Sequence, residues 1–166
     1  MSGPFATRTL LTATLAVMAA LAVPRVAAAQ EPVVFPAGIA CEFELRVESE
    51  TNPNRVFREW RDSDGNVVRT LEAGRGGDVT LVNTETGASL TLKGNGAVNR
   101  TTYNPDGSWT TELTGHYVLI LWPTDFPAGP STTLYVGRVT YTSTPDFTFT
   151  LVGSSGTQRD LCAELS

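Results

Sequence analysis

The single histidine, His116, is the first residue to consider for chemistry, because serine and cysteine hydrolases use a histidine base. It follows Gly115 and precedes an apolar run, and no Gly-x-Ser-x-Gly nucleophile motif occurs in the chain. One histidine and two cysteines also offer few ligands for zinc. We therefore predict no catalytic residue, no metal and no cofactor. The simplest interpretation of His116 is structural.

The run Asp62–Asn66, Asp-Ser-Asp-Gly-Asn, partly resembles a calcium-binding loop. Its glycine, Gly65, comes too early for the EF-hand spacing, and Leu71 stands where that loop carries its glutamate. A tight turn explains the same residues, since an Asp-Gly pair supplies the positive φ that hairpins need. A glycosidase would need two opposed carboxylates, and none of the 17 acidic residues is marked as such by its spacing.

Aromatic side chains could stack on a ligand. Trp109 and Trp122 fit the apolar phase of strands, whereas Trp60 has charged neighbours and is expected to be partly exposed. A ligand site at a barrel mouth would combine aromatic rings with a few polar groups. The candidate ligand-binding residues are therefore Trp60, Tyr103, His116 and Tyr135.

Strands must position these residues, because apolar side chains recur with a period of two. Cys41, Phe43, Leu45 and Val47 alternate with charged residues, and the apolar run 117–122 predicts a strand covered on both faces. Turn signals recur roughly every 8–12 residues, as in sandwiches and barrels. They include Asp64-Gly65, Thr86-Gly87, Asp106-Gly107 and the segment Lys93–Gly96.

The sequence therefore predicts an all-β fold of about ten strands. Short links favour a single antiparallel meander, closed into a barrel or strongly curled, with a β-sandwich as the alternative. In the strand predicted over 132–141, the apolar phase changes between Val136 and Val139, which predicts a bulge at Gly137.

The N-terminal segment is typical of a secretory signal peptide. Arg8 precedes the 14-residue apolar run Leu10–Val23, which is shorter than the roughly 20 residues that span a bilayer, and small residues follow at 27–29. We predict cleavage after Ala29, an extended lead-in over 30–40, an all-β domain over 41–166 and an extracellular location. No membrane span is expected in the mature chain.

Two cysteines and a low content of basic residues limit the remaining possibilities. In an exported chain, Cys41 and Cys162 are expected to form a disulfide. Without Arg8 and Arg25, ten basic residues face 17 acidic ones, a formal charge of −7. No basic run that would recruit nucleic acid or anionic lipid is visible. Asn99-Arg100-Thr101 matches the glycosylation sequon, whose use depends on the host.

Several strand–turn segments are similar to those of uncharacterised small secreted all-β proteins of actinobacterial type. They are Val79–Gly87, Ser89–Gly96, Asp106–Trp109, Leu134–Gly137 and Asp160–Leu165. The resemblance implies a two-cysteine, all-β, exported protein and assigns no activity.

Two functional classes remain. The first is a non-catalytic binding or surface-interaction module for a small ligand or an extracellular protein. The alternative is a small secreted barrel enzyme, a hydrolase or cyclase with a carboxylate and tyrosine site. The absence of a catalytic motif favours the first class, because catalysis needs titratable groups gathered in a cleft.

Overall fold

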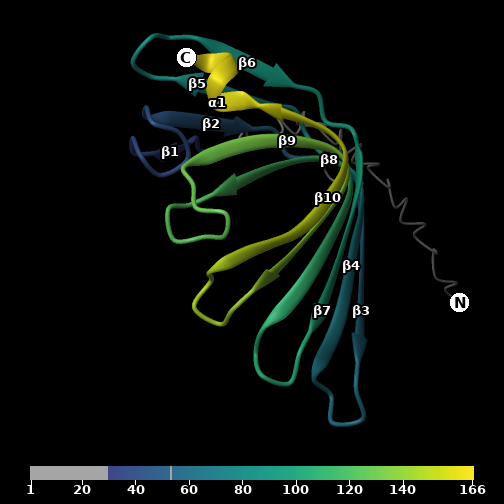
Figure 1. The fold of residues 1–166 in the computed structure, drawn as a ribbon. Helices are drawn as coiled ribbons and strands as arrows, with labels where there is room; N and C mark the ends of the chain where they lie inside the picture. The colour runs from purple at the N-terminus through teal and green to yellow at the C-terminus, as the bar shows by residue number, and fades with distance from the viewer. Residues whose placement is uncertain (1–29, 53) are drawn as a thin grey trace, which may run out of the picture.

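A computed structural model describes residues 30–52 and 54–166, which form ten strands and one short helix (Figure 1). The predicted signal peptide, residues 1–29, lies outside the described residues. The elements are β1 (Val33–Phe35), β2 (Leu45–Ser49), β3 (Arg55–Arg61), β4 (Val67–Arg75), β5 (Val79–Asn83), β6 (Ser89–Leu92), β7 (Gly96–Tyr103), β8 (Trp109–Leu121), β9 (Ser131–Ser143), β10 (Phe149–Asp160) and α1 (Leu161–Leu165).

The strands form two antiparallel sheets. The small sheet has the order β1-β2-β5-β6, and the large sheet has the order β10-β9-β8-β7-β4-β3. The all-β, ten-stranded prediction is confirmed. The predictions of one sheet and of a closed barrel are wrong, because the β5–β6 hairpin leaves the meander to pair with β2, and β3 and β10 remain separate edges. The two sheets give a sandwich-like arrangement, which was the alternative. The predicted lead-in contains β1, which pairs with β2.

A row of small residues crosses the large sheet at directly paired positions: Gly74, Ala97, Gly115, Gly137 and Gly156. The four glycines have φ values of +154°, +113°, +144° and +98°, a region that other residues rarely adopt. A Cβ at any of them would lie closer than 3.0 Å to the backbone of the adjacent strand. We call this row the crease, and Figure 1 shows that the long strands of this sheet arch over.

The crease explains the phase change in β9. Before the crease, Leu134 and Val136 lie on the face that packs against the small sheet. After the crease, Val139 is buried on the other face of the large sheet. No register shift occurs at Gly137, so the predicted bulge there is wrong. The irregularity lies instead in β10, between Leu151 and Gly153.

Two hydrophobic cores result, one on each face of the large sheet. The first core lies between the sheets and includes Leu45, Leu81 and Leu134. The second core lies inside the bend and is formed by Leu113, Tyr135 and Val139, with Tyr117 and Leu119 packed against it. The apolar run 117–121 in β8 contributes to both cores, as predicted for a strand covered on both faces.

The loop between β8 and β9 connects the two arms of the bent sheet on its concave side. Asp125 is 2% exposed, and its carboxylate accepts hydrogen bonds from the backbone N–H groups of Trp122, at 2.6 Å, and Phe149, at 2.8 Å. The backbone of Phe126 also bonds to Phe149 and Leu151 of β10. The loop thereby covers part of the β10 edge, which would otherwise offer unpaired backbone groups.

The C-terminal helix closes the first core. Strand β10 ends at Asp160, which caps α1, so Cys162 falls on the helix and pairs with Cys41 in a disulfide, as predicted. Leu161 and Leu165 are buried beside it, and the side-chain amide of Asn83 donates to the Leu165 carbonyl at 3.0 Å.

Replacing Gly137 by alanine should lower the free energy of unfolding by about 3 kcal/mol, because the new Cβ meets the backbone of β10 and the positive φ becomes strained. Urea unfolding monitored by circular dichroism measures the change. Gly153→Ala is the matched control, since a Cβ there meets nothing within 4 Å, and it should cost less than about 1 kcal/mol. Equal losses in both variants would show that the crease has no special role.

Removing the disulfide with the double variant Cys41→Ala/Cys162→Ala should lower the free energy of unfolding by about 2–5 kcal/mol, because the bond closes a loop of 121 residues. Unfolding of the unaltered protein with and without reductant provides the comparison. Labelling of a free thiol in the unreduced protein would contradict the pairing.

Candidate functional site

The four candidate residues do not form one site. Trp60 lies on the edge strand β3, with the Arg69 guanidinium 4.8 Å from its ring centroid. Tyr103 ends β7 and is 41% exposed, whereas Tyr135 is buried in the second core. His116 is exposed on β8 and lies opposite Val136, on the other face of the sheet from Tyr135.

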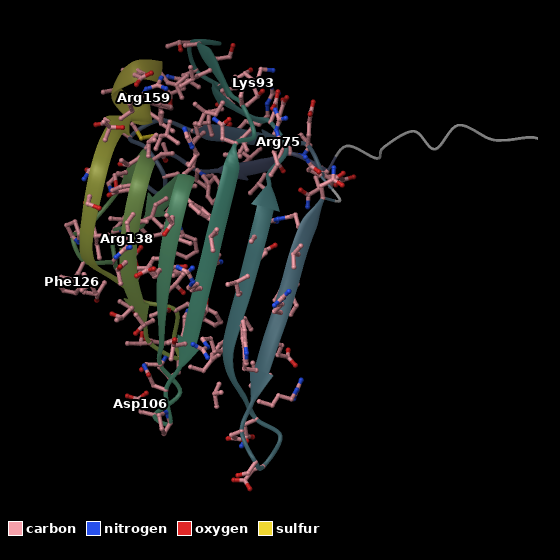
Figure 2. All side chains as sticks on the ribbon, turned by 90° about the vertical axis from the view of Figure 1, so that its right-hand side faces the viewer. Arg75, Lys93, Asp106, Phe126, Arg138 and Arg159 are labelled. Carbon is pink, nitrogen blue, oxygen red and sulfur yellow. A yellow bond between two sulfur atoms is a disulfide. The ribbon has the colours of Figure 1, made fainter. Side chains whose placement is uncertain are left out.

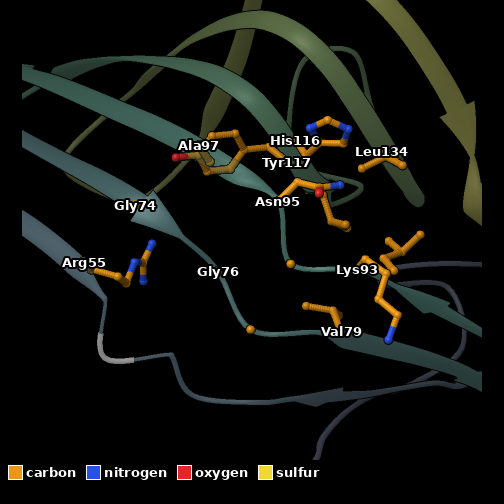
Figure 3. Close-up of a pocket in the computed structure, with 14 residues that line it drawn as sticks. Arg55, Gly74, Gly76, Val79, Lys93, Asn95, Ala97, His116, Tyr117 and Leu134 are labelled. Atoms are coloured by element: carbon orange, nitrogen blue, oxygen red, sulfur yellow. The ribbon is translucent and has the colours of Figure 1, made fainter.

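His116 lines a groove that runs along the junction of the two sheets, which we call the seam groove (Figure 3). It consists of two adjoining hollows of about 230 Å³ and 250 Å³. The hollows share Leu92, Lys93, Asn95, His116 and Leu134.

The seam groove has an apolar floor and a polar rim. The floor side chains are Val79, Leu92, Val118, Leu134 and Val136. The rim side chains with donor groups are Arg55, Thr91, Lys93, Asn95, His116 and Arg159. Among the described residues that line the two hollows, none is an aspartate or glutamate.

Two glycine-containing links build the groove where the chain crosses between the sheets. Gly76 and Gly77 connect β4 to β5, and Gly94 lies in the link from β6 to β7. A Cβ at Gly94 would collide with the carbonyl groups of the other link, so the two links pack backbone against backbone. Arg75 fixes this contact, because its Nε donates to the Gly94 carbonyl at 2.7 Å.

Asp78 holds Lys93 at the rim. One carboxylate oxygen lies 2.5 Å from Lys93 Nζ, and the other accepts from the Gly94 N–H at 2.9 Å. The hydrogen bond with Lys93 is the main reason that the pKa of Asp78 is lowered, and the same bond raises the pKa of Lys93. Both groups therefore keep their charges over the physiological pH range.

The other rim cations are also paired with carboxylates that lie outside the groove. Arg55 contacts Glu72 at 2.9 Å, and Arg159 contacts Glu164 at 2.5 Å. These pairs hold the long cationic side chains in place, which reduces the entropy that a ligand must remove to engage them.

Tyr117 also lines the groove, although its ring packs against the second core on the other face of the large sheet. Burial raises the pKa of Tyr117 to about 12, the nearby Glu72 carboxylate adds to the rise, and Arg55 opposes it. The phenol therefore stays protonated near neutral pH and acts as a hydrogen-bond donor rather than as a base.

The chemistry of the rim suits non-covalent binding. Cations and an amide surround an apolar floor, and a few polar groups around apolar side chains are the usual composition of a small-molecule site. His116 has no carboxylate among the residues that line the groove with it, so the orienting acid of a hydrolase triad is not in place there. In the part of the chain that the structure describes, no three His, Cys, Asp or Glu side chains gather as metal ligands.

Sequence reasoning missed most of the rim. The segment Lys93–Gly96 was expected to form a hairpin turn, but it links the two sheets, and Gly94 and Gly96 do not have positive φ. The turns at Gly65, Gly87 and Gly107 do have positive φ, as predicted. Trp122, expected in the core, is 44% exposed just after β8. The feature of the sequence that could have pointed to the rim was the lone lysine, Lys93, close to Gly94 and Gly96.

Comparisons with family models, curated proteins and solved structures find no match to this chain. The resemblance to small secreted actinobacterial proteins therefore stays a prediction. Across residues 30–52 and 54–166, no helix has the length and apolar character needed to cross a membrane.

Tyr117 should make the stability fall at alkaline pH. Its phenol ionises near pH 10 when unfolded and near 12 when folded, so the folded chain holds the proton more tightly. The stabilisation is therefore complete below pH 10 and is lost as the pH rises from 10 to 12. Urea unfolding across this range should show a smaller decline for Tyr117→Phe than for the unaltered protein. Tyr103→Phe, at an exposed ring, is the control and should keep the original decline.

Proposed function

We propose that this chain is an exported, non-catalytic binding domain whose seam groove holds a small molecule with an apolar body and an anionic group. The observation that carries the proposal is the composition of the groove. An apolar floor lies beneath Lys93, His116 and Asn95, and no described carboxylate lines the site. Cationic and amide donors favour an anion, while the floor favours hydrocarbon.

Export is supported by two independent features. The first 29 residues have the layout of a cleavable leader. The Cys41–Cys162 disulfide is of the kind that persists in oxidising compartments. A binding protein outside the cell would meet its ligand in solution or at the cell surface.

The dimensions of the groove limit the ligand. Each hollow is smaller than the roughly 300 Å³ at which drug-sized sites begin. A slender molecule that runs through both hollows fits better than a compact, bulky one. An alkyl or aryl carboxylate satisfies this shape, with its carboxylate at Lys93 and His116 and its hydrocarbon on Leu92 and Leu134.

At the seam groove, the alternative of a carboxylate and tyrosine enzyme would have to use Tyr117, the tyrosine that lines it, with the nearby Glu72. The pKa of about 12 that burial imposes on Tyr117 makes its hydroxyl a weak acid at neutral pH. Glu72 is engaged by Arg55 at 2.9 Å. Binding therefore explains the arrangement better than catalysis.

The proposal is tested by thermal unfolding of the protein with decanoate, with benzoate and with the neutral alcohol decanol. An anion at a hundred times its dissociation constant should stabilise the protein by about 2.7 kcal/mol, and decanol should stabilise it less. Lys93→Gln and His116→Gln should each weaken the effect of decanoate. Arg46→Gln, which breaks an exposed ion pair with Glu48 on the small sheet, is the matched control. Stabilisation by neither anion, or equal weakening in the control, would contradict the proposal.

A further inference from the structure

The large sheet carries a second candidate surface, on its convex side beyond the crease. Directly paired residues of an antiparallel sheet point to the same face, so the pairing register defines this surface. It continues the face that supports the small sheet, and Figure 2 views the molecule from this side, with Arg138 labelled. We call it the convex face.

Four arginines from four different strands meet on the convex face. Arg58 and Arg100 lie in one row, with Leu71 of β4 between them. Arg69 lies one row nearer the hairpin tips, and Arg138 lies one row nearer the crease. With strands roughly 4.8 Å apart, Arg58 and Arg100 are about 10 Å from each other. All four arginines are exposed.

This concentration of positive charge contrasts with the acidic composition of the chain. Among the described residues in these rows, Glu112 is the single carboxylate, and it contacts Arg100 at 3.2 Å and Arg138 at 3.8 Å. The face therefore carries four positive charges and one negative charge. Acidic side chains are found instead at the hairpin tips and on the small sheet, at Asp62, Asp64, Asp106, Asp146 and Glu48.

Hydroxyl groups and one aromatic ring complete the surface. Trp60 and Arg69 begin a row that continues with Thr102, Thr110, Thr142 and Thr150 on the four following strands. Trp60 is 37% exposed, and the nearby Arg69 guanidinium restrains it. The row thus places a stacking ring, a cation and a line of hydroxyls along one direction across the sheet.

We infer that the convex face binds an extended anionic polysaccharide, a sugar polymer that carries carboxylate, sulfate or phosphate groups. Guanidinium groups pair with such oxyanions through two hydrogen bonds. Threonine hydroxyls both donate to and accept from sugar hydroxyls, and an exposed indole can stack on a sugar ring. Single-stranded nucleic acid is less suited, because its bases need several stacking rings and Trp60 is the aromatic residue in these described rows.

The inference does not depend on the proposed ligand of the seam groove. The groove lies between the sheets, whereas the convex face lies beyond the crease, on the parts of the strands away from the core that the two sheets share. The four arginines are also separate from the residues that line the groove.

The test is binding of the purified protein to immobilised heparin, polygalacturonate and neutral dextran at increasing salt. We expect both anionic polymers to bind, dextran not to bind, and affinity to fall steeply between about 50 mM and 200 mM salt. The triple variant Arg58→Gln/Arg100→Gln/Arg138→Gln should bind at least roughly tenfold more weakly. Arg46→Gln, on the small sheet, should bind like the unaltered protein. Thermal unfolding of each variant shows whether it is folded.

Trp60→Ala separates sugar recognition from simple charge attraction. It should weaken the binding of heparin and polygalacturonate, and it should leave the weaker attraction of polyglutamate unchanged. Polyglutamate binding as tight as heparin, with the same loss in the triple variant, would assign the face to an acidic protein and overturn the inference. Tighter binding of duplex DNA would overturn it too, as would equal losses in the triple variant and in Arg46→Gln.

Discussion

The crease is the constraint on which the rest of the structure depends. At Gly74, Gly115, Gly137 and Gly156 the strands approach so closely that a Cβ would meet the backbone of the neighbouring strand. Because the glycines are aligned, these strands bend at the same position and keep their pairing. A sheet can be curved in this way by glycine kinks instead of a bulge in each strand. The bend then gives one sheet two cores, one beneath the small sheet and one inside the bend.

The same geometry creates the seam groove. Strand β7 begins at Gly96, next to the crease. Beyond Gly115, as far as Leu121, the edge of β8 that faces β7 therefore has no partner strand. The chain crosses between the sheets at this position through Gly77 and Gly94. The links pack closely because Gly94 has no side chain where it meets the carbonyl groups of Gly76 and Gly77. A hollow with an apolar floor remains beside them, between the sheets. Asp78 and Arg75 then fix the rim through hydrogen bonds to Lys93 and Gly94.

Charge is distributed unevenly over this frame. In the seam groove each long cationic side chain is balanced by a carboxylate behind it, so the site is polar without a large net charge. On the convex face four arginines share one glutamate, Glu112. An acidic chain can therefore present a basic surface, because the hairpin tips and the small sheet hold much of its negative charge. This uneven distribution is the basis of the polyanion binding that we infer for the convex face.

The amino-acid sequence by itself determined the β class, most of the strands and the covalent link. A period of two marks strands from local side-chain alternation alone, and Asp-Gly and Thr-Gly pairs mark turns through positive φ. Two cysteines in a chain with a predicted leader indicate one bond. The tertiary structure decided the rest, because pairing between distant strands cannot be seen from local pattern. In the tertiary structure β5 and β6 belong to a second sheet, and Gly137 is part of the crease rather than a bulge. Trp60, Tyr103 and Tyr135 lie apart from His116 and the seam groove. The tertiary structure also brought Arg58, Arg69, Arg100 and Arg138 onto one face, although they are scattered along the chain.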